Sequence, residues 1–134
     1  MRRIYVPLPG IEARMHLMEN LLSNESHALT RGDLEVLGNL TEGKYFKTPP
    51  PPLARTNCSS KGYSGHDITN LCKDAAMGPL REHQSSIATV DEALIRPVSM
   101  DDFRASLTRI KPSVAPEETQ QFEDWNTKFG VSAF

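Results

Sequence analysis

The side chains that most often perform catalysis are present in this chain, but they are scattered rather than grouped. The four histidines lie on separate stretches, at positions 16, 27, 66 and 83, without the spacing of metal ligands. There is no G-x-x-x-x-G-K-[ST] or G-x-G-x-x-G phosphate loop, no H-E-x-x-H and no C-x-x-C. The acidic pairs at 101–102 and 117–118 stand where helices are expected to begin, and the helix dipole explains them. The sequence therefore predicts a helical module rather than a self-sufficient enzyme.

Size and charge exclude several classes of protein. The chain has 134 residues, enough for one domain, and its formal net charge of -2 favours neither nucleic acid nor an anionic membrane as a partner. No apolar run approaches the ~20 residues that span a bilayer, so we expect no membrane insertion. Cys58 and Cys72 make no metal or disulfide framework. We therefore expect reduced thiols and an intracellular location, cytoplasmic or nuclear.

Hydrophobic periodicity predicts helices along most of the chain. Spacings of three and four residues indicate helices over 11–23, 30–43, 64–83, 99–111 and 116–130. In the first, Arg14 lies on the face opposite an apolar stripe made of Ala13, Leu17, Met18, Leu21 and Leu22. Pro79 should end or kink the third helix. Residues 2–8 suit an edge strand or an extended segment. The expected fold class is all-α, a bundle of about five helices with a short extended N-terminal segment.

Three of these helices begin at a quartet with the spacing of a capping box. In such a box the side chain of a Ser or Thr caps the helix, and an acidic side chain three residues later binds back to the cap. The three quartets are TRGD at 30–33, SGHD at 64–67 and SMDD at 99–102. We expect Asp67 to be a cap rather than a catalyst.

The segment 44–62 breaks the helical pattern. Its four prolines at 49–52 favour polyproline II locally, and it shows neither a helix nor a strand period. A structureless connection of this length is unusual inside a compact domain. We predict an inserted, disordered Pro-rich loop. The alternative is a Pro-rich ligand for a recognition module.

Several strings are more specific than composition. RRIYVPLP opens the chain, TEG precedes the Pro-rich segment, and YSGHDITNLCKDAAMGPLRE, IRPVSMDDF and IKPSVAPEETQQFEDWNTKFG follow it. In this order they resemble the small helical lid subdomain and C-terminal helix of the AAA ATPases of the meiotic clade. That group includes spastin, katanin, fidgetin and the ATPase that disassembles membrane-scission filaments. The ending WNTKFG at 125–130 is most similar to spastin and fidgetin, whereas 84–98 is too short for the β insertion of the membrane-scission ATPase.

The resemblance implies an AAA+ lid-type helical bundle and a division of the chain. Residues 1–10 correspond to an extended hinge segment from the large AAA subdomain, 11–111 to the lid, and 112–134 to a C-terminal docking helix. It also implies ATP, as Mg-ATP in the intact family, at the start of the third helix. The residues that would face the nucleotide are Tyr63, Ser64, Gly65 and His66. The alternative is that Ser64 only caps the helix and Gly65 only fits a tight space.

The resemblance further implies partners. The large AAA subdomain carries the phosphate loop, the metal-site motif and the arginine fingers, so this chain is not expected to hydrolyse ATP alone. The spacing of Phe122, Trp125 and Phe129 predicts an amphipathic helix, and the resemblance implies that its aromatic face docks on that subdomain. Neighbouring subunits of a homohexamer would be further partners. The expected function is the remodelling of a protein polymer, in particular microtubule severing with tubulin as substrate.

Three alternatives remain open from the sequence. The chain could be a stand-alone helical interaction module, the lid of the membrane-scission ATPase, or a fragment from an incomplete gene model, since Met1 directly precedes a mid-domain segment. Removing residues 44–62 restores the continuous string TEGYSG that relatives share. Because codons for residues 43–45 can read GGTAAGTAT and those for 56–57 ACTAAC, we hypothesise that 44–62 is a translated intron. Mature message that contains these codons would disprove this.

Overall fold

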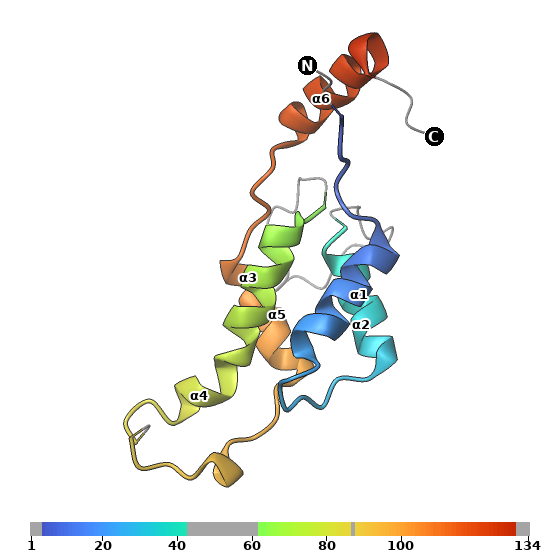
Figure 1. Ribbon diagram of the computed structural model, residues 1–134. Helices are drawn as coiled ribbons and strands as arrows, with labels where there is room; N and C mark the ends of the chain where they lie inside the picture. Colours follow the sequence, from blue (N-terminus) through green and yellow to red (C-terminus); the bar gives the residue numbers. More distant parts are fainter. Residues whose placement is uncertain (1–3, 43–61, 87, 131–134) are drawn as a thin grey trace, which may run out of the picture.

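The computed structural model describes residues 4–42, 62–86 and 88–130, and within them the chain is helical (Figure 1). The elements are α1 (Ile11–Leu22), α2 (Arg31–Leu40), α3 (Gly65–Ala76), α4 (Gly78–Glu82), the 3-10 helix η2 (Glu92–Leu94), α5 (Met100–Arg109) and α6 (Pro116–Phe129). The described residues contain no strand, only a single bridge between His27 and Val98. The predicted all-α fold is confirmed, and residues 4–10 form the extended segment without strand pairing.

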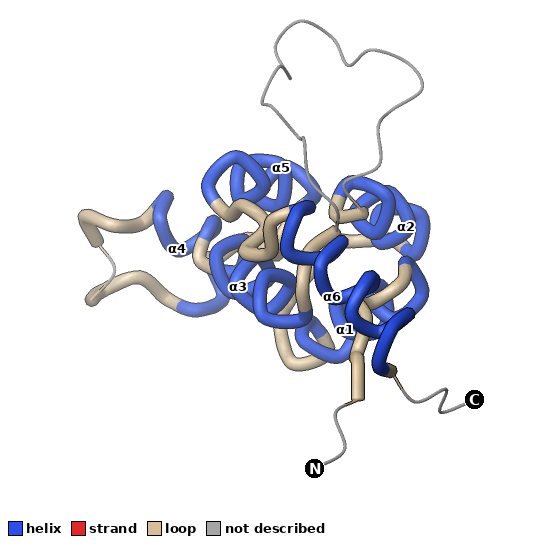
Figure 2. Tube along the Cα trace, turned by 90° about the horizontal axis from the view of Figure 1, so that it is seen from above, coloured by secondary structure: helices blue, strands red, loops and turns tan. Residues whose placement is uncertain are grey.

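Four helices enclose the core. α1 packs against α2 and α3, and α3 packs against α5, which produces the two-by-two arrangement seen end-on in Figure 2. The side chains that fill the centre are apolar and almost fully buried: Met18, Leu22, Leu37, Ile68, Leu71 and Phe103. Burial of such side chains stabilises each by about 1.5–3 kcal/mol relative to exposure. α3 ends at Ala76, and Pro79 lies in the first turn of α4, so the helix is interrupted just before this proline, as the sequence predicts.

The capping quartets form as predicted. Asp33 of α2 accepts hydrogen bonds from the backbone N and the Oγ1 of Thr30, both at 2.8 Å. Asp67 does the same for Ser64 at the start of α3. In both pairs the hydroxyl also accepts from the Asp backbone N–H, which completes the box. Local sequence therefore sets where these helices begin.

The buried face of α1 contains Met18 and Leu22 as predicted, but it differs from the prediction at positions 13 and 14. Arg14 is only 2% exposed, and its guanidinium donates to the carbonyls of Pro9 at 2.6 Å and Gly38 at 2.9 Å, whereas Ala13 is exposed. The reason lies in α2. A Cβ on Gly38 would stand 3.0 Å from Ile11 Cγ1, so the glycine lets α1 approach with its Ile11 side inward. Burial lowers the pKa of the Arg14 guanidinium, and the negative charge of Glu42 opposes this.

The chain closes on itself across the Pro-rich segment. The backbone N of Gly62 donates to the Glu42 carbonyl, and the backbone N of Tyr63 donates to the Thr41 carbonyl, both at 2.9 Å. The predicted inserted loop 44–62 lies outside the described residues apart from Gly62. The two ends of this segment, after α2 and before α3, therefore lie next to each other.

This closure leads to a prediction for a deletion. A chain lacking residues 44–62 is expected to keep its fold and to gain up to about 2 kcal/mol in unfolding free energy, because a long connection adds loop-closure entropy that a direct link avoids. Urea unfolding followed by circular dichroism measures the difference. A deletion variant that is less stable than the intact chain would show that the segment packs on the bundle.

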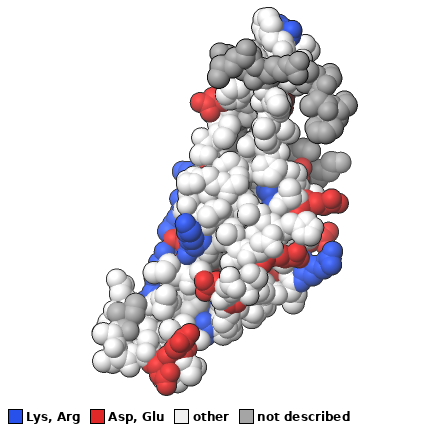
Figure 3. Space-filling view, viewed as in Figure 1, with Lys and Arg blue, Asp and Glu red and all other residues white. Residues whose placement is uncertain are grey.

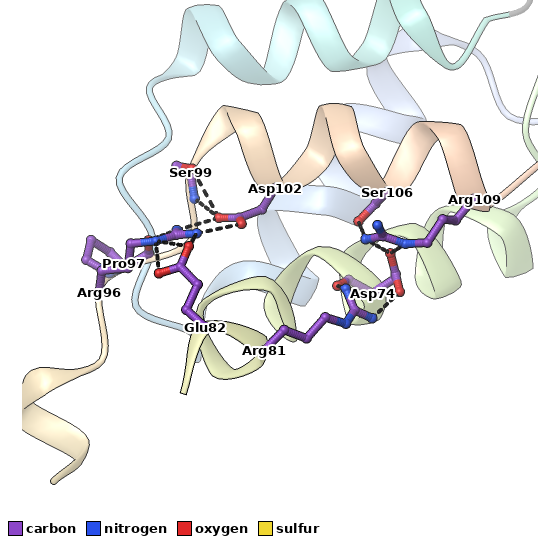
Figure 4. Close-up of polar contacts among 9 residues, drawn as sticks. All are labelled: Asp74, Arg81, Glu82, Arg96, Pro97, Ser99, Asp102, Ser106 and Arg109. Carbon is purple, nitrogen blue, oxygen red and sulfur yellow. Dashed lines mark hydrogen bonds and ion pairs between the residues drawn. The ribbon is translucent and has the colours of Figure 1, made fainter. Parts of the chain in front are cut away.

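Two ion-pair clusters join α3, α4 and α5 (Figure 4). Asp74 accepts from Arg81 at 2.5 Å and from Arg109 Nη2 at 2.7 Å. Burial by itself would raise the pKa of Asp74, but hydrogen bonds, first from Ser106 and then from Arg109, outweigh it and lower that pKa to about 2. These contacts hold α4 at the end of the bundle opposite α6.

The second cluster is built on Arg96, which precedes α5. Its Nη1 donates to Asp102 Oδ2 at 2.7 Å, and its Nε donates to both carboxylate oxygens of Glu82 at 3.0 Å. The hydrogen bond from Arg96 lowers the pKa of Asp102 to about 2, against the opposing effect of burial. Arg96 thereby ties the segment before α5 to α4.

Acid is expected to weaken the fold through Asp74 and Asp102. Their folded-state pKa values, about 2 for each, lie below the unfolded value of about 3.9. Their contribution to the unfolding free energy is therefore fully present above the unfolded pKa and is lost as pH falls through the folded pKa. After allowance for the partly exposed arginines, we expect the unfolding free energy to fall by about 2 kcal/mol between about pH 5 and pH 2. Urea unfolding across this range measures it. An Asp102→Asn chain should show a shallower fall; an equally steep one would contradict the assignment.

Candidate nucleotide-facing end and docking groove

The first predicted site residue, Tyr63, lies inside the structure. It is 6% exposed, its backbone N binds the Thr41 carbonyl, and its hydroxyl donates to the Ile110 carbonyl at 2.6 Å. Tyr63 thus connects the end of α2, the start of α3 and the end of α5. These bonds fix the position of the backbone that leads into Ser64, Gly65 and His66.

Ser64 caps α3 and shares its acidic partner with a distant residue. Besides Ser64, Asp67 Oδ2 accepts from the backbone N of Ser113 at 3.1 Å and from its Oγ at 3.0 Å. Burial alone would raise the pKa of Asp67, but these hydrogen bonds together hold it below its usual value. Asp67 is therefore a charged cap, as predicted, and it also binds the linker between α5 and α6.

Gly65 has space around it within the chain. A Cβ at this position would meet only Leu17 Cδ2, at 3.9 Å, which is ordinary van der Waals contact. Its backbone is not in the left-handed region that favours glycine. The alternative that Gly65 fits a tight space is therefore not supported by the described residues, and no contact among them requires a glycine here.

His66 is exposed beside Gly65. Its Nε2 lies 3.0 Å from Asn70 Nδ2, one helical turn away. Ser64, Gly65 and His66 together form the surface at the N-terminus of α3, where backbone N–H groups and the positive end of the helix dipole suit an anion or a polar ligand. No group of three or more His, Cys, Asp or Glu side chains among the described residues is placed to hold a metal ion.

The aromatic face of α6 borders a groove. Ile4, Tyr5 and Val6 of the extended segment and three residues of α6, Gln121, Phe122 and Trp125, line a space of about 700 Å³. We call this the α6 groove. Ile4 is 71% exposed and Phe122 55% exposed. Large apolar side chains gathered in this way mark a surface that binds another protein surface.

Phe129 extends the same face. It is 69% exposed, and its ring centroid lies 6.3 Å from that of Trp125. The structure therefore brings together Phe122, Trp125 and Phe129 as the helical spacing predicts, and it adds Ile4 and Val6, which sequence reasoning did not include in the docking face. Among the described elements, α6 has no extensive contact with another helix.

Positive and negative charges are mixed on the face of the molecule that Figure 3 shows. Figure 3 shows acidic and basic side chains on the same face of the molecule, without a continuous basic surface of the kind that binds nucleic acid. No helix in the described ranges is long and apolar enough to cross a membrane. The N-terminus of α3 thus offers polar groups for ligand recognition, and the α6 groove offers apolar side chains for docking.

Two family models match overlapping parts of the chain. Residues 53–105 match the AAA+ lid domain, and residues 82–130 match the Vps4 C terminal oligomerisation domain. The ATPase-like fidgetin of Schizosaccharomyces pombe is 43% identical over 129 residues, which is 96% of this chain and 17% of that protein. Spastin of Danio rerio is 37% identical over 130 residues, which is 96% of this chain and 20% of spastin. The chain has the lid and C-terminal elements of the meiotic-clade AAA ATPases.

Solved structures agree with this assignment. The crystal structure of the FIGL-1 AAA domain in complex with ADP superposes with a TM-score of 0.80 and 32% identity, over 98% of this chain and 38% of that one. A katanin structure determined to explain its self-assembly superposes with a TM-score of 0.68 and 25% identity, over 92% of this chain and 39% of that one. The AAA chain described here has the lid and oligomerisation elements, and it spans about one sixth of the fidgetin relative.

Proposed function

We propose that this AAA lid closes over ATP, bound as Mg-ATP against a large nucleotide-binding subdomain, and takes part in a homohexamer that remodels a protein polymer. The observation that carries the proposal is the superposition of nearly the whole chain on part of an ADP-bound AAA domain. The phosphate loop and the metal ligands would come from the large subdomain, because this sequence contains neither motif. The lid itself contributes binding and movement rather than bond chemistry.

The N-terminus of α3 supports the nucleotide part of the proposal. Ser64, Gly65 and His66 lie at the surface, and no contact among the described residues requires a glycine at position 65. A missing Cβ lets a ligand approach the backbone closely. We assign these three residues to the adenosine side of the nucleotide, with Tyr63 supporting them from below.

The α6 groove supports the assembly part. Its exposed apolar side chains match the surface that a large AAA subdomain would cover, and the oligomerisation family match includes all of α6. The extended segment on the other wall of the groove corresponds to the hinge from that subdomain. We therefore propose the large subdomain as the occupant of the groove, and neighbouring subunits of the ring as further partners.

Microtubule severing, with tubulin as substrate and an intracellular site of action, is the more specific proposal. It is supported by the spastin and fidgetin relatives and by the short segment between α4 and α5, where only η2 is formed in the described residues. The exposed groove also favours a second candidate, a stand-alone module that binds another protein through α6. The two differ in whether the groove is covered by an AAA subdomain.

A chimera tests the proposed function. The corresponding C-terminal region of the Schizosaccharomyces pombe relative is replaced by this chain, with and without residues 44–62. We expect the chimera without the segment to hydrolyse ATP, to form rings in sedimentation and electron microscopy, and to cut stabilised microtubules. A chimera that folds and binds nucleotide but never hydrolyses it would overturn the lid assignment. Hydrolysis without cutting would overturn only the polymer assignment.

A glycine substitution tests the nucleotide-facing surface. Gly65→Ala is expected to stabilise the 134-residue chain slightly, by about 0.5 kcal/mol, because alanine favours helix and the Cβ has space. In the chimera the same Cβ would obstruct the nucleotide and raise the KM for ATP about tenfold, roughly 1.4 kcal/mol. Gly32→Ala, in the first turn of α2, is the matched control and should leave KM unchanged. An unchanged KM for Gly65→Ala would remove position 65 from the site.

A further inference from the structure

One carboxylate oxygen at the start of α3 holds two separate segments of the chain. Asp67 Oδ2 accepts from Ser64 N at 2.9 Å and Ser64 Oγ at 2.8 Å, which cap the helix. It also accepts from the backbone N and the hydroxyl of Ser113, 46 residues further along. Asp67 is 3% exposed, so these donors compensate the loss of water around its charge.

The neighbouring Tyr63 holds the same segment at a second point. Its hydroxyl donates to the carbonyl of Ile110, the residue that ends α5. The linker between α5 and α6 is thus bonded to the start of α3 at residues 110 and 113 (Figure 1). Two bonded points fix both the position and the direction in which a chain segment leaves.

These bonds matter because α6 packs little against the other described helices. No helix pair that includes α6 shows extensive contact among the described residues, and its aromatic side chains face the groove. The direction of the linker therefore contributes to where α6 stands relative to the bundle. The α5–α6 linker in turn depends on groups at the same helix N-terminus as Ser64, Gly65 and His66.

We propose that Asp67 and Tyr63 form a latch that positions α6, so that the orientation of the assembly helix is set at the start of α3. This inference deepens the proposed function and rests on it for the role of α6 in assembly. The latch itself concerns only the 134-residue chain. A ligand that shifts Ser64 would also shift Asp67 and, through Ser113, the linker.

The chain offers a matched pair of variants for the test. Asp67→Asn and Asp33→Asn each replace the acidic residue of a capping box, but only Asp67 also binds the linker. A double variant, Tyr63→Phe with Ser113→Ala, removes two linker hydroxyl bonds and leaves the α3 cap in place. This variant keeps the test decisive even where Asp67→Asn does not fold.

Residual dipolar couplings and ¹⁵N relaxation of α6 amides report its orientation directly. In the wild-type chain we expect α6 and the four-helix bundle to share one alignment. In Asp67→Asn and in the double variant, the α6 couplings should shrink roughly two-fold while those of the bundle persist, because α6 then samples several orientations. Asp33→Asn should leave the α6 couplings unchanged. Couplings that stay the same in a folded Asp67→Asn chain and in the double variant would overturn the latch.

Assembly in the chimera separates the latch from the proposed function. Ring formation is expected to weaken in the double variant about as much as α6 orientation is lost. Altered α6 couplings with unaltered ring formation would support the latch and overturn the role of α6 in assembly. Unaltered couplings with weakened ring formation would overturn the latch and leave the proposed function in place.

Discussion

Replacing Gly78 by alanine is expected to lower the free energy of unfolding by about 3 kcal/mol. A Cβ on Gly78 would overlap the Asp102 carboxylate, much closer than van der Waals contact, and would stand 3.1 Å from its Cβ, so α4 and α5 could not keep their spacing. Any retreat of Asp102 would break its bonds to Arg96 at 2.7 and 2.9 Å. Overpacking and the loss of a partly buried ion pair therefore act together.

Urea unfolding of the 134-residue chain measures this effect. Gly32→Ala is the control, because a Cβ at Gly32 would meet only Thr30 Oγ1, at 3.7 Å. This control is expected to be neutral or to stabilise by up to about 1 kcal/mol through helix propensity. If Gly78→Ala proved as stable as the control, the approach of α4 to α5 would be wrong as described.

Replacing Trp125 by alanine is expected to separate folding from assembly. In the 134-residue chain the unfolding free energy should change little, since α6 has no extensive contact with another described helix. In the chimera, loss of an aromatic side chain from the centre of a covered groove should cost at least about 2 kcal/mol, which is roughly 30-fold in subunit affinity. Analytical ultracentrifugation across protein concentrations measures the shift in ring assembly.

A second exposed apolar residue provides the control for Trp125. Leu94 is 70% exposed, on η2 at the opposite end of the bundle, and Leu94→Ala should leave assembly unchanged. Equal assembly of the Trp125→Ala and wild-type chimeras would show that the groove is not covered in the ring. A large loss of stability in the isolated Trp125→Ala chain would instead show that α6 packs on its own bundle.

Local sequence predicted the helix beginnings well. The quartets at 30–33, 64–67 and 99–102 each place an acidic side chain three residues after a hydroxyl residue, and such bonds close within one turn. The prolines at 79 and 112 marked the ends of α3 and α5 for the equally local reason that proline lacks a backbone N–H. The spacing of 122, 125 and 129 predicted one aromatic face on α6.

Periodicity predicted the burial of Met18 and Leu22 on α1 but not that of Arg14. Arg14 satisfies two carbonyls, one of them on α2, and only the folded bundle offers that second acceptor. The pattern of apolar residues alone placed Ala13 inward, because hydrophobicity scales count an arginine as polar whatever its partners. The approach permitted by Gly38 depends on which helix faces it, and that is decided by packing.

The candidate site also has a part that the sequence predicted and a part that only the folded structure shows. The string YSGHD and its family resemblance predicted Tyr63, Ser64, Gly65 and His66 as nucleotide-facing residues, and a helix N-terminus is a local property that residue types and spacing determine. Nothing in the string IKPSVAP, residues 110–116, indicated that Ser113 would bind Asp67 or that Ile110 would bind Tyr63. A hydrogen bond between residues 46 positions apart exists only once α3 and α5 have packed.

The sequence by itself determined the helical fold class, the caps, the aromatic face of α6 and the family, because each depends on residues within a few turns of one another or on a contiguous string. Only the tertiary structure decided that Arg14 is buried, that Gly65 has free space, and that the linker to α6 is bonded to the start of α3. Those features depend on which surfaces meet, and burial changes the energetic value of a polar side chain more than its identity does.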